Sequence, residues 1–262
     1  MRLRFWRRTV PVIELHGLIA GRPGLLNLQS AAPLIERGFA AAGKRAVILD
    51  IDSPGGSPVQ SDLIAALIRR RAEKSGVAVH AVIADVGASG GYWIACAADR
   101  IWANPMTIVG SIGVRGGGFG FPGLLSRLGV ERRLYKAGSH KARLDPFLPE
   151  SEDDVAFVQT LMDDLHARFK AWVRVRRAGR LTGDEDAVFD GSFMLGDRGL
   201  ALGLIDGFGD VASVVLELGG DTARPRVFKP RPRGLLRRLP GLGAHALLDA
   251  AEERRWRIDL LT

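Results

Sequence analysis

The sequence predicts an α/β fold built on a largely parallel, buried β-sheet. Short apolar runs alternate along the chain with segments whose apolar residues recur at helical spacing. Several of the apolar runs are continuous, which is typical of strands covered on both faces. Many of the 33 glycines fall between these runs, where tight turns are needed. Together these patterns favour strands of one sheet connected by helices.

The elements follow from the same patterns, taken in order. We expect strands over residues 10–15, 46–51, 77–83, 100–103, 108–114 and 132–136. We expect helices over residues 28–42, 61–74, 94–98, 124–128, 150–177, 194–202 and 211–218. The helix over 61–74 shows the reasoning, because its four large aliphatic residues share one face (Leu63, Ile64, Leu67 and Ile68). No internal repeat is visible.

Length and composition predict one large core with a peripheral extension. The chain has 262 residues, of which 47% are hydrophobic. Composition shifts near Gly220, and the Pro/Arg-rich stretch 224–242 is expected to be a linker. Residues 244–261 are expected to form a short amphipathic helix. The sequence therefore predicts a basic tail over residues 220–262.

The charge balance is basic, with a formal net charge of +8 and a sequence pI of about 10.3. Much of the excess lies at the two ends of the chain. Charged ends are usually solvated arms, and the alternative is attraction to anionic lipid or nucleic acid. No nucleic-acid-binding motif accompanies the charge, so we expect solvated arms first, with peripheral contact with an anionic membrane as the alternative and no specific nucleic-acid partner.

Cysteine and targeting signals constrain the compartment. Cys96 is the single cysteine, so no intrachain disulfide can form, and a small buried residue is expected there. No apolar run reaches the roughly 18 residues that span a bilayer. Glu14 and His16 interrupt the apolar run after the basic N-terminus, so a signal peptide is not expected. The expected location is cytoplasmic or peripheral to the membrane. No cluster has zinc-ligand spacing, and neither a metal nor a cofactor is expected.

Residues 87–91 (Gly-Ala-Ser-Gly-Gly) form the most informative segment. They match the G-x-S-x-G pattern and lie between an apolar run and a helix-like run of small residues. A serine at such a turn exposes its hydroxyl beside backbone N–H groups, as a nucleophile requires. A structural turn with a serine N-cap explains the same local pattern equally well.

A serine nucleophile needs a base, and the sequence offers several weak candidates. His16 and His80 fall on strands, His166 falls within a long helix, and His245 lies in the tail. The loop 136–147 holds both His140 and Lys141. A lysine acts as a base only when it is neutral, which burial without a counter-ion favours.

Two glycine-rich segments are candidates for binding negative charge. Gly55 and Gly56 follow the 46–51 strand, and glycine lets a backbone N–H approach a substrate carbonyl closely. An ordinary Pro-Gly turn is the alternative. Residues 118–123 fit G-x-G-x-x-G, but Pro122 removes an N–H and no acidic residue follows at the required place. A flexible loop is expected there.

Several segments, in this order, resemble one known family. They are residues 51–56 (Ile-Asp-Ser-Pro-Gly-Gly), 88–93 (Ala-Ser-Gly-Gly-Tyr-Trp), 97–105, 109–114 (Val-Gly-Ser-Ile-Gly-Val) and the loop 138–147. The chain resembles the SppA-type signal peptide peptidases over residues 9–219. These are serine proteases with a Ser/Lys dyad and a ClpP/crotonase-like fold, so the resemblance implies such a domain over that range.

The resemblance also implies roles for particular residues. Ser89 matches the nucleophile, Lys141 the general base, and Ser111 the hydroxyl that holds the lysine amine. The backbone N–H groups of Gly56 and Gly90 match the oxyanion hole. Family members assemble into homo-oligomeric rings in which neighbouring protomers can share the dyad, and they cleave hydrophobic peptides such as remnant signal peptides. Bacterial members usually carry an N-terminal membrane anchor, which is not expected here, and the Arg-rich tail is not part of the family pattern.

Two other functions stay open at this point. An α/β-hydrolase esterase would use Ser89 with a later Asp and His245, although the lipase-type run of glycines after a histidine is absent. A crotonase-fold scaffold without catalysis would use its basic ends to bind a membrane or a partner. A ClpP-type protease is close in fold, but it needs a histidine soon after the serine helix, where Val114 and Arg115 stand.

Overall fold

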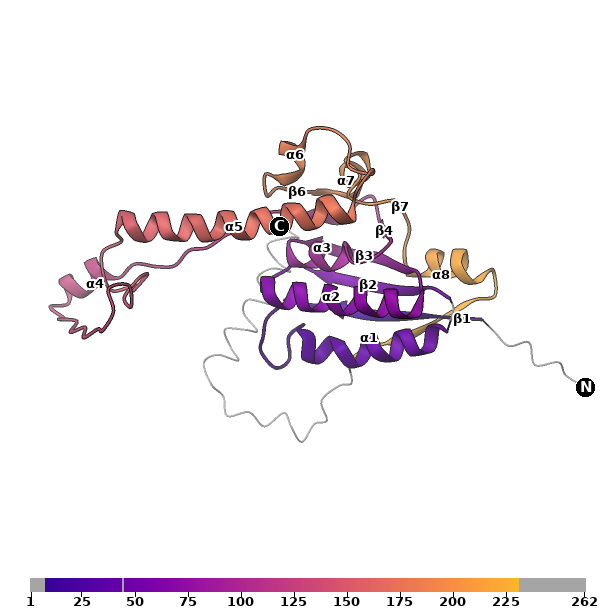
Figure 1. Cartoon of the computed structure of the whole chain (residues 1–262), viewed down its shortest axis with the longest axis horizontal. Helices are drawn as coiled ribbons and strands as arrows, with labels where there is room; N and C mark the ends of the chain where they lie inside the picture. The colour runs from indigo at the N-terminus through magenta and orange to yellow at the C-terminus, as the bar shows by residue number, and fades with distance from the viewer. Residues whose placement is uncertain (1–7, 44, 231–262) are drawn as a thin grey trace, which may run out of the picture.

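A computed structural model describes residues 8–43 and 45–230. Within them one sheet runs through the molecule in the order β6-β5-β3-β2-β1-β8, with β4 and β7 branching from β3 (Figure 1). All strand pairs are parallel except β5 with β6. The α/β fold with a largely parallel sheet is therefore confirmed.

The strands are β1 (Thr9–His16), β2 (Val47–Ser53), β3 (Val79–Ala88), β4 (Arg100–Ala103), β5 (Ile108–Gly110), β6 (Phe193–Leu195), β7 (Gly207–Phe208) and β8 (Arg224–Phe228). The helices are α1 (Leu28–Ala42), α2 (Pro58–Ser75), α3 (Gly90–Ala95), α4 (Pro122–Arg127), α5 (Glu152–Arg176), α6 (Glu185–Phe189), α7 (Gly196–Ala201) and α8 (Val211–Gly219). None of the helices in the described ranges is both long enough and apolar enough to cross a bilayer.

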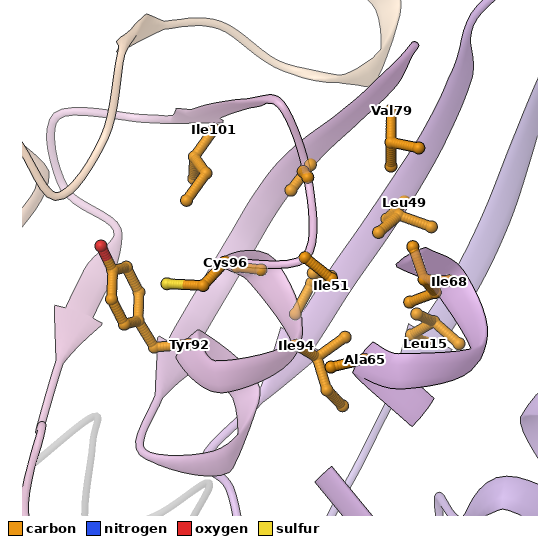
Figure 2. Close-up of a cluster of buried hydrophobic side chains, with 14 of the residues drawn as sticks. Leu15, Leu49, Ile51, Ala65, Ile68, Val79, Tyr92, Ile94, Cys96 and Ile101 are labelled. Atoms are coloured by element: carbon orange, nitrogen blue, oxygen red, sulfur yellow. The ribbon is translucent and has the colours of Figure 1, made fainter. Parts of the chain in front are cut away.

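The core lies on both faces of the central strands. On one face, α1, α2 and α3 cover β1, β2 and β3; Figure 2 shows Leu49 and Ile51 of β2 facing Ile68 of α2 and Ile94 of α3. On the other face, α8 packs Val214 and Val215 against a smaller apolar cluster. Because strands buried on both faces need no polar side, this arrangement explains the continuous apolar runs.

Strand β3 is the point at which the sheet divides. Its first half pairs with β4, from His80 opposite Arg100 to Ile83 opposite Ala103. Its second half pairs with β5, from Val86 opposite Ile108 to Ala88 opposite Gly110. The carboxyl ends of β2, β3 and β5 therefore lie side by side, where ligands of parallel sheets usually bind.

Helix α5 projects from this body and carries α4 near its far end (Figure 1). We call the projecting part of α5, together with residues 114–151, the arm. The helix has 25 residues, so it is about 37 Å long. Only Phe169 and Val173, near its carboxyl end, are buried. The residues before it, 114–151, form α4 and irregular loops with exposed apolar side chains, including Phe119 and Tyr135 at 83% and 90% exposure.

Several predicted elements were wrong, wholly or in part. The strand expected over 108–114 ends at Gly110. Residues 132–136, expected as a strand, pair with no other strand in the described chain and lie on the arm. Residues 193–195 form β6 before α7 begins, although one helix was expected over 194–202. Residues 224–228 fall in the expected linker but form β8, because Phe228 packs its buried ring beneath α1. The helix expected over 244–261 lies outside the described residues.

Two histidines give the fold opposite responses to pH. The imidazole of His80 accepts a hydrogen bond from Trp102 Nε1 at 3.2 Å, and burial lowers its pKa below 6.5. Burial also lowers the pKa of His16, but the hydrogen bond and charge of Asp50 outweigh it and raise the pKa overall. His80 therefore contributes stability that is present above about pH 6.5 and lost as pH falls through its folded-state pKa. The stability that His16 contributes is present below about pH 6.5 and lost as pH rises through the folded-state pKa of His16.

We expect His80→Gln to flatten the loss of stability on acidification from about pH 7 to pH 5, because the glutamine cannot be protonated. His16→Gln should instead steepen that loss, since it removes the contribution that favours the folded state at low pH. Urea unfolding across this range measures both. Identical pH profiles for the wild type and both variants would contradict the assignment.

Candidate active site

Ser89 lies at the turn between β3 and α3 with a strained backbone. Its φ is +50° and its ψ is −119°, a conformation that residues other than glycine rarely adopt. The amide of Ser89 donates to the Gly110 carbonyl at 2.9 Å, and the Trp93 amide donates to the Ser89 carbonyl at 2.9 Å. The hydroxyl makes no capping hydrogen bond to α3. The N-cap explanation of this serine is therefore not supported, and its Oγ is left for other use.

Ser111 repeats this geometry on the neighbouring strand. Because Ala88 pairs with Gly110, the next residues, Ser89 and Ser111, leave adjacent parallel strands together. Ser111 also has a positive φ, +51°, and its amide donates to the Ser192 carbonyl at 2.8 Å. Two strained serines side by side are typical of a functional site rather than of a structural turn.

The loop after β2 packs directly against the Ser89 turn. Gly55 has a φ of +102°, and a Cβ there would lie 2.7 Å from the Gly90 amide nitrogen and 2.8 Å from Ser89 Cβ. The Ile19 amide donates to the Gly55 carbonyl and the Ser57 amide donates to the Ile19 carbonyl, both within 2.8 Å. This parallel pairing directs the N–H of Gly56 away from Ile19.

A long cleft of about 1570 Å³ contains these residues. Its lining includes Ser89, Ser111, Gly56 and Gly90, which the sequence resemblance brought together. Helix α5 forms the opposite wall with apolar and aromatic side chains. Trp172 stacks on Trp93 at 5.9 Å between ring centroids, and its indole N–H donates to the Trp93 carbonyl at 3.0 Å. The cleft has room for part of a peptide chain, and α5 also lines it with the charged side chains of Asp163 and Arg168.

Lys141, the fifth predicted site residue, lies outside this cleft. It is exposed on the arm and is not part of the cleft lining. Arg143 holds its loop to the start of α5 by pairing with Asp153 at 2.5 Å and Asp154 at 3.4 Å. Asp153 is about 20 Å along the helix axis from His166, whose ring contacts the turn that carries Ser111. A lysine side chain of about 6 Å cannot span that distance, so the structure does not bring Lys141 to Ser89 within one chain.

Within the described residues, each histidine considered as a base either contacts another residue or lies outside the cleft lining. His16 and His80 lie on β1 and β3 with the partners described above, and His140 is exposed beside Lys141. His245 lies outside the described residues. His166, on α5, lines the cleft, and its Nε2 lies 2.9 Å from the Ile112 carbonyl. That contact fastens α5 to the turn that carries Ser111.

Sequence reasoning missed the contribution of α5 to the cleft. Met162, His166, Phe169 and Trp172 all line it and recur at intervals of three or four residues. This spacing places them on one helical face. The signal was present in the sequence, but it did not distinguish a cleft wall from a face buried in the core.

We expect Gly55→Ala to lower kcat/KM for peptide cleavage by about 10²–10³-fold, because the new methyl group displaces the Gly90 amide and Ser89. Gly76→Ala is the matched control. Gly76 also has a positive φ, +66°, but no atom lies within 4 Å of the added Cβ. The control carries the cost of a positive φ without the clash, so it should lose less stability in urea and keep its turnover. Equal turnover of the two variants would contradict the role of the Gly55 loop.

The parallel sheet, with a strained serine and adjoining glycine amides at its carboxyl edge, has the architecture of the ClpP/crotonase-like fold class. The model of peptidase family S49 matches residues 71–222, more than half of the chain. The chain therefore belongs to peptidase family S49, and the prediction of a serine-type peptidase of the signal peptide peptidase kind is confirmed at the level of the family.

Individual relatives agree with this family. A putative protease of Synechocystis sp. is 31% identical over 245 residues, covering 90% of this chain and 84% of its own length. A putative signal peptide peptidase SppA of Enterococcus faecium is 33% identical over 168 residues, covering 63% and 47%. A Brucella melitensis protein named as the Na(+)/H(+) antiporter NhaA is 47% identical over 247 residues. That match covers 92% of this chain but 33% of the relative, so the chain spans about one third of its length.

Proposed function

We propose that this chain is a serine endopeptidase that cleaves hydrophobic peptides with a Ser89/Lys141 dyad assembled between neighbouring copies. The observation that carries the proposal is the Ser89 turn, which is strained and uncapped and packs against the Gly55–Gly56 loop in a cleft of about 1570 Å³. Family membership supports peptide-bond hydrolysis as the reaction.

The proposed reaction is acyl transfer to water. Ser89 Oγ attacks the peptide carbonyl carbon while its proton passes to the neutral amine of Lys141. The amides of Gly56 and Gly90 donate hydrogen bonds to the resulting oxyanion. The lysine ammonium then protonates the leaving amine as the C–N bond breaks, which leaves an ester on Ser89. Water attacks this ester with the same lysine as base, and Ser89 is released.

Ser111 is proposed to orient the lysine amine. It lies beside Ser89 because their strands are paired, and its turn is fixed through the Ser192 carbonyl and by His166. A hydroxyl at this place accepts or donates a hydrogen bond without carrying a charge. It can therefore hold an incoming amine without stabilising its protonated form as a carboxylate would.

A second copy of the chain is proposed to supply Lys141. The arm that carries it exposes many apolar side chains (Phe119, Leu124, Leu128, Val130, Tyr135, Leu144, Val155, Phe157 and Leu161). So much exposed apolar surface is unusual on a subunit that works alone. A head-to-tail contact between arm and cleft closes into a ring when repeated with rotation.

Mixing subunits tests the shared dyad. Ser89→Ala and Lys141→Ala are each expected to be inactive. When equal amounts are unfolded together and refolded, about one quarter of the sites should combine an intact Ser89 from one subunit with an intact Lys141 from its neighbour. Turnover near a quarter of the wild-type value supports the proposal. A mixture as inactive as its components would show that the dyad is not shared.

The two alternative functions predict different results. A scaffold without catalysis would leave Ser89 unlabelled by a serine-reactive phosphonate. An esterase using His245 would lose its activity when the chain is cut after residue 230, and it would prefer esters to hydrophobic peptides. Membership of the S49 family favours the peptidase over both.

A further inference from the structure

A cluster of arginines runs along the β8 border of the sheet. Its members are all exposed: Arg8, Arg37, Arg45, Arg224 and Arg226. None of them forms an ion pair with a carboxylate of residues 8–43 or 45–230. We call this cluster the basic edge.

Three of these arginines meet where β1 and β8 begin. The Arg224 amide donates to the Arg8 carbonyl at 3.0 Å, and Thr9 pairs with Arg224 in the sheet. Arg45 Nη1 lies 3.5 Å from the Thr9 carbonyl. The strand pairing and the loop after α1 therefore place these three arginines at one corner of the sheet, which gives that corner a positive field.

The other two arginines share one aromatic ring. The Arg37 guanidinium lies 5.2 Å from the centre of the Phe228 ring, and the Arg226 guanidinium lies 5.3 Å from it. Phe228 is itself buried beneath α1. The fixed ring thus holds two guanidinium groups at this surface, and their combined positive charge favours an anionic partner.

The adjoining sequence indicates which anion this surface takes. Residues 1–8 read Met-Arg-Leu-Arg-Phe-Trp-Arg-Arg and lead directly into the corner at Arg8. Cations interleaved with Leu, Phe and Trp are typical of segments that lie at a membrane interface, since the apolar side chains gain free energy among acyl chains. We propose that the basic edge docks this protein on the surface of an anionic phospholipid bilayer.

Docking at this border leaves the cleft accessible. β8 is three strands from β3 in the sheet order, a separation of about 14 Å. Ser89 lies at the carboxyl end of β3, whereas the corner at Arg8 and Arg224 lies at the opposite ends of the strands. The proposed docking therefore does not depend on the peptidase activity.

The test is sedimentation of the full chain, carrying Ser89→Ala, with vesicles of phosphatidylcholine alone or with about 30% phosphatidylserine. We expect binding only to the anionic vesicles, and we expect it to weaken as salt rises from about 0.05 to 0.5 M. Arg37→Gln/Arg226→Gln should weaken binding by about 30-fold. Arg100→Gln/Arg198→Gln removes the same charge from exposed positions outside the basic edge and should have little effect.

Three results would overturn the proposal. One is equal binding to neutral and anionic vesicles. Another is equal loss of binding in the two double variants, which would show a response to net charge alone. The third is tighter binding to an RNA oligonucleotide than to anionic vesicles at the same ionic strength. Because the tested protein lacks Ser89, none of these outcomes depends on whether the proposed peptidase mechanism is right.

Discussion

Replacing Ser89 by alanine is expected to lower peptide turnover by about 10⁴–10⁶-fold while leaving the fold intact. The substitution removes the only atom proposed to bond to the substrate. The hydroxyl makes no capping hydrogen bond in the structure, so its loss should not destabilise α3. The measurement is kcat/KM for a hydrophobic peptide, with circular dichroism and urea unfolding to confirm the fold.

Ser61→Ala provides the matched control for this prediction. Ser61 also lines the cleft, but its hydroxyl donates to the Ser57 carbonyl at 3.0 Å within α2. The Ser61→Ala variant should retain most of the wild-type turnover. A Ser89→Ala variant that cleaves within tenfold of the wild type would exclude Ser89 as the nucleophile, whatever the state of the dyad.

Replacing Arg177 by methionine is expected to destabilise the fold by about 3–5 kcal/mol. The Arg177 side chain is fully buried, and it donates to the Gly203 carbonyl at 2.7 and 2.9 Å and to both oxygens of Asp206 at 2.7 and 3.0 Å. Asp206 in turn accepts from the Ile101 amide at 2.7 Å. Methionine fills a similar space but removes the buried donors to the Gly203 carbonyl and to Asp206, which keeps only the Ile101 amide and the Arg180 ion pair at 3.4 Å.

A surface pair serves as the control. Arg174 donates two hydrogen bonds to Glu185, but both side chains are well exposed. Arg174→Met should therefore change the stability only slightly, because water replaces the lost partner. Arg177→Met/Asp206→Asn should recover part of the loss, since no buried charge is left unpaired. Equal losses at Arg177 and Arg174 in urea unfolding would contradict the argument.

The sequence predicted the structure best where apolar residues recur at a single spacing. The helix over 28–42 was predicted from its helical spacing with the observed bounds; in the structure the Asn27 side chain caps its start and Gly43 follows its end. It was least informative on the arm. Residues 132–136 have a strand-like composition, but β pairing requires a neighbouring strand, and the arm offers none within the described chain. Local propensity could not reveal that this segment leaves the sheet.

The candidate site was predictable in the same uneven way. Ser89, Ser111, Gly56 and Gly90 follow strands whose carboxyl ends converge, so order along the chain indicated their proximity. Lys141 follows no strand, and nothing in the one-dimensional pattern indicates how far α5 carries its loop from the body. The role of β8 was hidden for a related reason: two arginines and a proline mask a strand that Phe228 anchors from a single buried position.

The length of α5 has a consequence for control of the enzyme. Under the proposed mechanism an isolated subunit is dormant, because its reactive hydroxyl and its amine lie too far apart to meet. Specific activity then falls on dilution and rises with self-association, so newly made chains are harmless until enough of them have accumulated. Such a peptidase requires neither a removable inhibitory segment nor a separate activating protein.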